Sequence, residues 1–325
     1  MNNPNNKKFP SISVLMSCFN GTRWIDKAVT SVLNQSHAVQ EFIIVDDGST
    51  DDSLKVISRW AQLDKRIKVV PKDNSGLADS LNFGIGLCTS EWIARIDVDD
   101  LWHEDRIKNQ IEVIVSNKNI QFISGSMIEI DNYDNQIKHY KYPEDHKQLR
   151  NRLLALKGFP PHSSVMYKKS LVEKLGLYRG QIKRAEDHDL WLRMSEVADL
   201  NCSNKSVTYI RKHEAQISNE SSGLTQLRDA FISVCCAHAR SQGLEEPISY
   251  SNVDFDKFEV ELDKVFEDFQ FYRFFSMTRF IKSLLKGKVN RQSDVSLRYA
   301  IYYWYPYLFR MHYLKRMATN ILNKH

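Results

Sequence analysis

Residues 92–100 read WIARIDVDD, a short apolar run followed by three carboxylates. Residues 42–49 read FIIVDDGS, which has the same form earlier in the chain. Two apolar strands that each carry acids at the carboxyl end are typical of an open α/β sheet with a ligand crevice at that edge. Acids spaced as Asp-x-Asp offer hard oxygen ligands to a divalent cation that also touches a phosphate. The two stretches therefore predict an α/β domain with nucleotide-diphosphate chemistry.

Short apolar runs alternate with helical patterns over residues 11–131. The pattern predicts strands at 11–19, 41–46, 67–70, 92–96 and 120–130, and helices at 22–34, from about 51, at 76–87 and at 105–115. Strands alternating with such helices form βαβ units and a mostly parallel sheet. Beyond residue 131 the pattern predicts a loop that becomes a helix over 140–156, strands at 164–167 and 207–211, a helix at 186–197 and only helices from about 224.

Length and composition predict a globular protein. The 325 residues suffice for one large domain with an appendage, and 42% of them are hydrophobic and 26% charged. The five cysteines show no C-x-x-C spacing, which favours reduced thiols in a cytosolic protein. Residues 1–10 are polar and are interpreted as a disordered lead-in without a signal-peptide core. The longest apolar run, residues 299–309, is far shorter than the about 20 residues of a transmembrane helix.

Charge is distributed unevenly along the chain. Residues 271–325 contain eleven Lys or Arg and one acid, while the whole chain carries +5, so residues 1–270 are net negative. Aromatic residues are dense over 253–325. This composition fits a helical appendage packed on the main domain, or an interfacial helix on an anionic membrane surface. Nucleic-acid-binding proteins can share it, but the acidic crevice upstream argues against nucleic acid as a partner.

The strand-end acids have a functional and a structural interpretation. Asp97, Asp99 and Asp100 would hold Mg²⁺ or Mn²⁺ against two phosphate oxygens, or would form a capped turn before a helix. Asp46 and Asp47 would accept hydrogen bonds from a base or a ribose, or would close a strand as an acidic turn. Because two such strands occur in one chain, the functional interpretation is favoured for Asp97, Asp99 and Asp100.

Two common nucleotide-binding motifs are absent from the sequence. The chain lacks both G-x-x-x-x-G-K-[ST] and G-x-G-x-x-G, which argues against P-loop NTPases and dinucleotide oxidoreductases.

A third acid group begins the helix predicted at 186–197. Glu186 and Asp187 lie in its first turn, where the helix dipole stabilises negative charge without any catalytic role. The same position would hold the carboxylate of a general base rigidly and exposed, and no other acid cluster occurs in the second half of the sheet domain. His162 and His213 are weaker candidates, because a lone histidine is more often a packed or surface residue than a ligand.

Seven motifs occur in the order found in the family 2 glycosyltransferases, which the chain resembles over about residues 10–218. They are ISVLMSCFN at 12–20, SVLNQS at 31–36, IVDDGSTD at 44–51, NSGL at 74–77, RIDVDD at 95–100, PHSSVM at 161–166 and EDHDLW at 186–191. The resemblance implies the GT-A fold, a Rossmann-like α/β sheet, mostly parallel and flanked by helices. It implies a catalytic domain at 11–220, with a nucleotide-binding half at 11–131 and an acceptor half at 132–220, followed by a helical C-terminal region at 221–325.

The resemblance also implies a nucleotide site. Ser17, Phe19 and Asp47 would surround the base, with Asp47 accepting a hydrogen bond from it. Phe19 stands where the family often has tyrosine, so the stacking surface is kept and the hydroxyl is not. Asp46 would belong to the same site, and Asp97 would lie at the ribose or the diphosphate.

The remaining implied roles concern the reaction. Asp99 would be the main ligand of Mn²⁺ or Mg²⁺, and His213 would approach the diphosphate. Asp187 would be the catalytic base that takes a proton from the acceptor hydroxyl. Glu186 and His162 would lie on the acceptor side.

The implied activity is inverting, metal-dependent transfer of a hexosyl or N-acetylhexosaminyl group from a nucleotide-sugar, with UDP as the first choice, to a glycan hydroxyl. A polyprenyl-diphosphate-linked acceptor in O-antigen or capsule synthesis would place the enzyme in the cytoplasm, on the inner face of the plasma membrane. Two alternatives stay open. A sugar-phosphate nucleotidyltransferase would release pyrophosphate from a nucleoside triphosphate, and a non-catalytic glycan- or nucleotide-binding protein would bind the donor without turnover.

Overall fold

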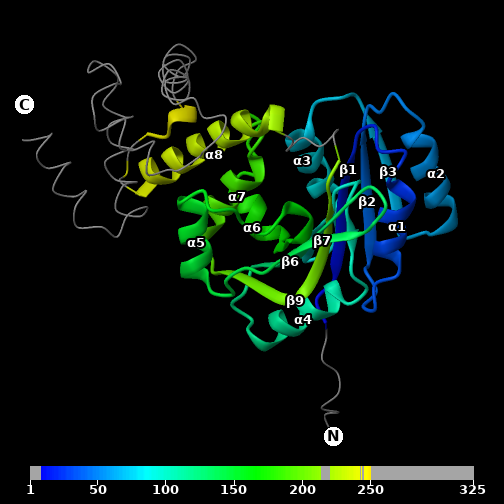
Figure 1. Cartoon of the computed structure of the whole chain (residues 1–325), viewed down its shortest axis with the longest axis horizontal. Helices are drawn as coiled ribbons and strands as arrows, with labels where there is room; N and C mark the ends of the chain where they lie inside the picture. Colours follow the sequence, from blue (N-terminus) through cyan, green and yellow to red (C-terminus); the bar gives the residue numbers. More distant parts are fainter. Residues whose placement is uncertain (1–8, 214–219, 242, 244, 250–325) are drawn as a thin grey trace, which may run out of the picture.

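A nine-stranded sheet forms the centre of the part of the chain that the structure, a computed structural model, describes: residues 9–213, 220–241, 243 and 245–249 (Figure 1). The strand order is β3-β2-β1-β4-β8-β6-β9-β5, and β7 pairs with β6 beside this path. The strands are β1 Ile12–Cys18, β2 Glu41–Asp47, β3 Ile67–Lys72, β4 Trp92–Arg95, β5 Leu101–Trp102, β6 Phe122–Ile130, β7 Gln136–Tyr140, β8 Met166–Lys168 and β9 Leu200–Arg211. The helices are α1 Ile25–Leu33, α2 Ser53–Leu63, α3 Leu77–Leu87, α4 Arg106–Ser116, α5 His146–Leu154, α6 Lys169–Lys174, α7 Glu186–Ser195 and α8 Glu220–Ser241.

Helices cover both faces of the sheet, which explains the uninterrupted apolar runs of the first strands. In β2, Ile44 packs in the cluster that contains the buried residues of α1 and α4, whereas its neighbour Val45 packs in the cluster of α3 and α7. Val14 and Leu15 of β1 divide between the same two clusters, and all four side chains are fully buried. Each of these strands therefore contributes to two cores at once.

Most strands run in one direction, as the sequence pattern predicts. β1 pairs in parallel with β2 and β4, and β2 with β3. β8 is antiparallel to both of its neighbours, β4 and β6, so β6 runs in the direction of β4, and β9 is parallel to β6. The short strands β5 and β7 run the other way. The sheet is thus parallel in its first half and mixed in its second.

The second half holds the elements that the sequence pattern did not predict, namely β5, β7 and α6. The strand predicted at 207–211 is only the end of β9, which begins at Leu200. Its polar first half, NCSNKS at 201–206, carries no apolar alternation, and main-chain pairing with β6 makes it a strand. The register shifts between Gly125 and Ser126, so Ser203 and Val207 pair with successive residues of β6.

Helix α8 packs along α7 (Figure 1) and is tied to it by ion pairs. Arg240 of α8 pairs with Glu196 just after α7 and with Glu246, which also pairs with Arg179. No helix within the described ranges is long and apolar enough to cross a membrane. The lead-in predicted over residues 1–10 falls mostly, and the basic-aromatic segment at 253–325 entirely, outside the described residues.

Candidate active site

The carboxyl ends of β1, β2 and β4 meet at one edge of the sheet. The register places Cys18 beside Asp46 and Leu15 beside Arg95, so the residues that follow the three strands are neighbours in space. In an open α/β sheet this edge is where ligands bind. The strand-end motifs predicted from sequence are therefore brought together here.

An aromatic ring is exposed at the end of β1. Phe19 is 49% exposed, and Ser17 is half-buried two residues earlier. The loop after Phe19 is fixed to the loop after β2, because the Asn20 N–H donates to Ser49 Oγ (3.1 Å) and the Thr50 N–H donates to Asn20 Oδ1 (2.8 Å). An exposed ring on a fixed loop has the form that stacking on a base requires.

Asp47 and Asp46 are both buried, but only Asp46 keeps an oxygen without a hydrogen-bond partner. The carboxylate of Asp47 accepts from Lys72 Nζ (2.7 Å) and from the N–H groups of Ser75 (2.9 Å) and Gly76 (3.0 Å). Burial alone would raise the pKa of Asp47, but these donors outweigh it and lower the pKa. Asp47 thus holds the loop before α3, whereas Asp46 Oδ1 is a buried acceptor without a protein donor.

Arg95 lies fully buried behind the acid at the end of β4. Its guanidinium donates to the Asp97 carboxylate and to the carbonyl of Leu15 (3.2 Å). Asp97 also accepts from Ser163 Oγ (2.9 Å). Burial favours the protonated form of Asp97, but the Arg95 charge outweighs it and the pKa of Asp97 lies below its usual value. Asp97 is therefore an oriented anion at the crevice.

His162 lies in the interior beside Arg95. Its Nε2 is 3.2 Å from Arg95 Nε and 2.7 Å from the Tyr178 hydroxyl, and its ring meets the Trp191 ring edge-on at 5.6 Å. Burial, followed by the Arg95 charge, lowers the pKa of His162 well below its usual value. Because arginine only donates, Nε2 accepts and the neutral ring carries its proton on Nδ1. His162 is only 8% exposed and contacts Arg95, so its role is to hold the Arg95 side chain in position.

Asp99 and His213 converge from segments far apart in the chain. His213 Nε2 lies 2.9 Å from Asp99 Oδ2, and both side chains are partly exposed. Within the described residues no three His, Cys, Asp or Glu side chains form a complete metal cage. One carboxylate oxygen and one imidazole nitrogen suit Mn²⁺, whose other positions a diphosphate and water could fill. The two residues therefore fit as the protein ligands of a shared ion.

Asp100 has a structural place beside this pair. Its Oδ1 accepts from the Arg211 N–H (3.1 Å), and its Oδ2 shares a hydrogen bond with Ser163 Oγ, the hydroxyl that also contacts Asp97. Burial, then the charges of Asp99 and Asp97, raises the pKa of Asp100 well above its usual value. Asp100 thus ties β9 and the turn before β8 to the loop of acids.

The Arg211 guanidinium joins three segments around Asp99. Nε donates to the Asp99 carbonyl (3.0 Å), Nη1 donates to the Asp131 carbonyl (2.8 Å), and Nη2 pairs with the Asp134 carboxylate (2.6 Å). The guanidinium also lies 4.3 Å from the centre of the Trp24 ring. The loop after β4, the turn after β6 and the start of α1 are therefore fixed to one buried side chain.

The first turn of α7 supplies the candidate base. Asp187 is partly exposed, and its Oδ1 accepts from the His188 N–H (2.6 Å). Burial, with the charge of Asp97 adding to it, raises the pKa of Asp187 to about 6. Burial and the charge of Asp187 raise the pKa of Glu186 to about 8. At neutral pH this geometry leaves Asp187 ionised beside a protonated Glu186, as a general base requires.

Asp189, in the same turn, anchors the helix. It is fully buried and accepts from Arg179 Nε (2.9 Å) and Arg193 Nε (3.0 Å). The two arginines fix where α7 begins and therefore where Asp187 stands.

Sequence reasoning missed the residues that support the site, namely Arg95, Ser163, Tyr178 and Arg211. Arg95 and Ser163 each lie inside a quoted motif, RIDVDD at 95–100 and PHSSVM at 161–166, and that was the available signal. Nothing in the sequence marks Tyr178 or Arg211, because their roles depend on β9 and on the segment before α7 folding back onto β4.

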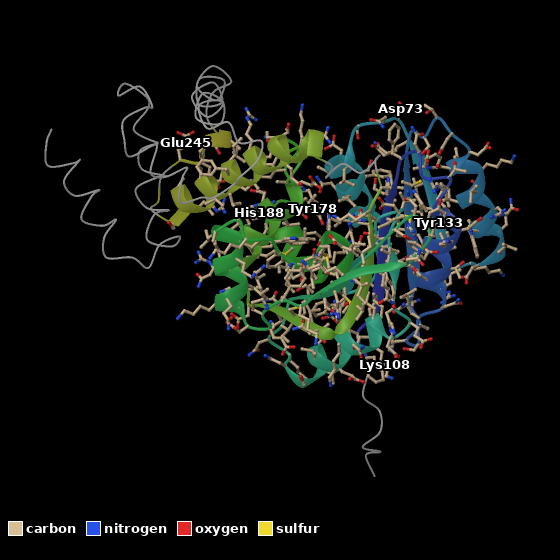
Figure 2. All side chains as sticks on the ribbon, viewed as in Figure 1. Asp73, Lys108, Tyr133, Tyr178, His188 and Glu245 are labelled. Carbon is tan, nitrogen blue, oxygen red and sulfur yellow. The ribbon has the colours of Figure 1, made fainter. Side chains whose placement is uncertain are left out.

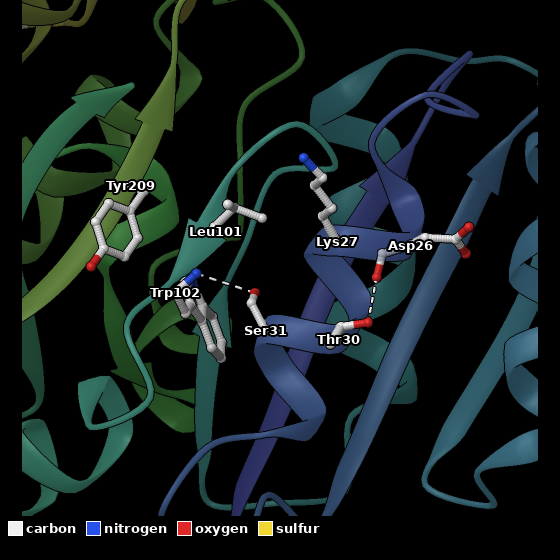
Figure 3. A pocket seen from close by; sticks show the side chains of 7 residues that line it. All are labelled: Asp26, Lys27, Thr30, Ser31, Leu101, Trp102 and Tyr209. Atoms are coloured by element: carbon white, nitrogen blue, oxygen red, sulfur yellow. Dashed lines mark hydrogen bonds between the residues drawn. The ribbon is translucent and has the colours of Figure 1, made fainter. Parts of the chain in front are cut away.

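A separate hollow of about 370 Å³ lies between α1 and the strands β5 and β9 (Figure 3). Its lining residues are Asp26, Lys27, Thr30, Ser31, Leu101, Trp102 and Tyr209. None of these was predicted as a site residue. Lys27 pairs with Asp134, so the hollow adjoins the turn that Arg211 holds.

Comparisons with known proteins identify the family of the chain. A model of the family described as Glycosyl transferase family 2 matches residues 13–176. The O-antigen biosynthesis glycosyltransferase WbnJ of Escherichia coli is 28% identical over 225 residues, which cover 69% of this chain and 87% of the relative. The putative glycosyltransferase EpsE of Bacillus subtilis (strain 168) is 32% identical over 194 residues, which cover 58% of this chain and 67% of that protein.

Solved glycosyltransferase structures share the fold. S. aureus TarS, in complex with UDP-GlcNAc, superposes with a TM-score of 0.60 at 16% identity, covering 92% of this chain and 88% of that one. The mannosyltransferase PcManGT from Pyrobaculum calidifontis, in complex with GDP-Man and Mn²⁺, gives a TM-score of 0.56 at 14% identity, covering 98% and 87%. The likeness identifies the architecture as GT-A.

Proposed function

Because the chain belongs to glycosyl transferase family 2, we propose that it transfers a sugar from a nucleotide-sugar, with UDP as the first candidate nucleotide, to a hydroxyl of a glycan acceptor with inversion. The observation that carries the proposal is the convergence of Asp97, Asp99 and His213 at the strand ends. Asp187, whose pKa is raised to about 6, lies near Asp97. The solved structures that hold UDP-GlcNAc and GDP-Man support a nucleotide-sugar donor.

The donor would lie along the carboxyl edge of the first strands. Its base would stack on Phe19 and donate to the carboxylate of Asp47 or Asp46, both of which end β2 at this edge. Asp97 would accept from the ribose. Asp99 and His213 would hold Mn²⁺ or Mg²⁺. When bound, such an ion supplies positive charge that stabilises the diphosphate leaving group.

Asp187 would take the proton of the acceptor hydroxyl as its oxygen attacks the anomeric carbon. The attack comes from the face opposite the diphosphate, so the new bond has inverted stereochemistry. Glu186 would stand beside the acceptor as a neutral hydrogen-bonding group, because burial keeps its pKa near 8. His162 would act from behind by fixing Arg95 and, through it, Asp97.

A role in O-antigen or capsule synthesis is the physiological part of the proposal, supported by the similarity to an O-antigen glycosyltransferase. A polyprenyl-linked acceptor would require the enzyme to act at the inner face of the plasma membrane. The basic-aromatic composition of residues 253–325 supports such a place by charge and aromatic content.

The test is nucleoside-diphosphate release from UDP-, GDP- and dTDP-sugars with Mn²⁺, with and without EDTA. Asp99→Asn should abolish release, while Asp199→Asn, which alters a side chain 72% exposed, should not. Release of one nucleoside diphosphate that EDTA blocks would support the proposal and identify the donor. Binding of none of the donors in a thermal-shift assay would overturn it.

A further inference from the structure

The turn between β6 and β7 presents a large aromatic side chain to solvent. Tyr133 is 83% exposed and Ile137, on β7, is 58% exposed. Four of the five residues of β7 are exposed, so both faces of this strand are open. The hairpin therefore presents two large side chains that have no packing role within the described residues.

The turn is rigid before any ligand arrives. Asp131 Oδ1 accepts from the N–H groups of Tyr133 (2.8 Å) and Asn135 (2.9 Å), and its Oδ2 accepts from the Asn135 side chain (2.9 Å). Asp134 adopts a positive φ of 69°, which closes the turn. A side chain presented on a preformed turn loses little conformational freedom on binding.

The turn is also fixed beside the catalytic acids. One Arg211 guanidinium bonds the Asp99 carbonyl, the Asp131 carbonyl and the Asp134 carboxylate. Asp134 pairs in addition with Lys27 of α1, and Figure 2 places Tyr133 over that helix. Tyr133 lies in the chain between Asp131 and Asp134, and the Arg211 side chain joins both of these residues to the Asp99 loop.

The chemistry of the turn fits a sugar ring. An exposed tyrosine offers a flat apolar face with a polar tip, which suits the C–H face of a pyranose. Carboxamides flank it at Asn132, Asn135 and Gln136, and these groups both donate to and accept from hydroxyls.

We propose that the β6–β7 turn is a glycan-acceptor platform, with Tyr133 stacking on a pyranose ring of the acceptor next to Asp99. This inference rests on the proposed function and specifies where the acceptor binds. Arg211 is its positioning residue, because it holds the platform and the metal-binding acid in one fixed relation.

Saturation-transfer NMR on the full chain, with diamagnetic Mg²⁺ and UDP, tests the platform. The probes are the methyl β-glycosides of glucose, galactose and N-acetylglucosamine. In the wild-type protein the ring C–H protons of at least one glycoside should saturate. Tyr133→Ala should weaken that glycoside's binding roughly 3- to 10-fold, the range for one aromatic contact. Tyr133→Phe should keep it, because the ring face remains.

Two controls separate this inference from the proposed function. Leu63→Ala, which removes an apolar side chain 71% exposed at the end of α2, should leave both glycoside and UDP signals unchanged. The UDP signal should persist in Tyr133→Ala, and its absence from the wild-type protein would count against the donor site rather than the platform.

Three results would overturn the platform. One is an unchanged glycoside affinity in Tyr133→Ala. The second is a wild-type protein that binds UDP but none of the glycosides. The third is loss of sedimentation with phosphatidylglycerol vesicles in Tyr133→Ala while glycoside binding stays the same, which would assign the turn to a lipid surface.

Discussion

His213 Nε2 lies 2.9 Å from Asp99 Oδ2, although 114 positions separate the two residues in the chain. The contact depends on β9, which follows β6 in parallel and delivers His213 to the end of β4. Two ligand atoms held this close by segments far apart in the chain form a pair that one divalent ion could bind.

Removal of either donor should abolish metal-dependent turnover. We expect Asp99→Asn and His213→Ala each to lower Mn²⁺-dependent nucleoside-diphosphate release at least about 100-fold, because the leaving group loses charge stabilisation. Release kinetics over a Mn²⁺ titration provide the measurement. Asp199→Asn serves as the acid-to-amide control, and a variant at Asp99 that keeps wild-type rates would remove this residue from the metal site.

Turnover should depend on pH through the candidate base. Because the pKa of Asp187 is raised to about 6, the rate should rise with pH up to about 6 and stay level above it. Asp187→Asn should transfer no sugar at any pH while still binding the donor. A rate that is flat between pH 5 and pH 7 would contradict the assignment.

The same raised pKa has a consequence for stability. The folded protein binds this proton more tightly than the unfolded chain, so stability falls as pH rises from about 4 to about 6 and then levels off. Asp187→Asn should therefore be more stable than wild type above pH 6, on the order of 1 kcal/mol, and equal to it below pH 4. Urea denaturation at pH 4 and pH 8 measures the difference.

Asp189, two residues away, should behave in the opposite way. Its pKa is lowered: burial opposes the shift, but Arg193 and Arg179 outweigh it, so its contribution to stability is present above pH 4 and is lost as pH falls through the lowered value. Asp189→Asn should destabilise the fold by about 3–5 kcal/mol at pH 8, because it leaves buried guanidinium groups without their anion. Equal denaturation midpoints for Asp189→Asn and wild type would show that the pairs contribute nothing.

Phe19 allows a matched test of base stacking. Phe9 precedes β1 and is 53% exposed, while Phe19 follows β1 and is 49% exposed, so the two mark opposite ends of one strand. Phe19→Ala should weaken UDP binding roughly 5- to 100-fold, the range for loss of one base–aromatic stack. Phe9→Ala should leave the affinity unchanged in the same calorimetric titration, and equal losses in both variants would argue against stacking.

The first half of the fold could be predicted because β1, β2 and β4 are buried on both faces and its strands alternate with helices of regular period. The predicted strand at 41–46 corresponds to β2 Glu41–Asp47, and the helix at 105–115 corresponds to α4 Arg106–Ser116. β5 escaped because it is only two residues long and pairs with β9, which comes far later in the chain, so no local pattern records the pairing. β7, which forms a hairpin with β6, escaped because four of its five residues are exposed and give it no buried face.

The acid-bearing motifs could be found for the same reason, since each follows a recognisable strand or begins a helix. The residues that hold these acids in place could not be found from the sequence. Arg211 and Tyr178 act on Asp99 and His162 only through tertiary contacts. Nor does the sequence indicate that Asp47, unlike Asp46 Oδ1, accepts hydrogen bonds from protein donors. That difference depends on where Lys72 and the Ser75 N–H lie in the folded chain.

Strand β4 has a parallel neighbour, β1, on one side and an antiparallel neighbour, β8, on the other. The acids that follow it therefore stand where the parallel part of the sheet meets the mixed part. Under the proposed function, the donor is bound from the β1 side and the acceptor from the elements beyond β8. Substitutions beyond β8 should then change which acceptor is used and leave the nucleotide-sugar unchanged.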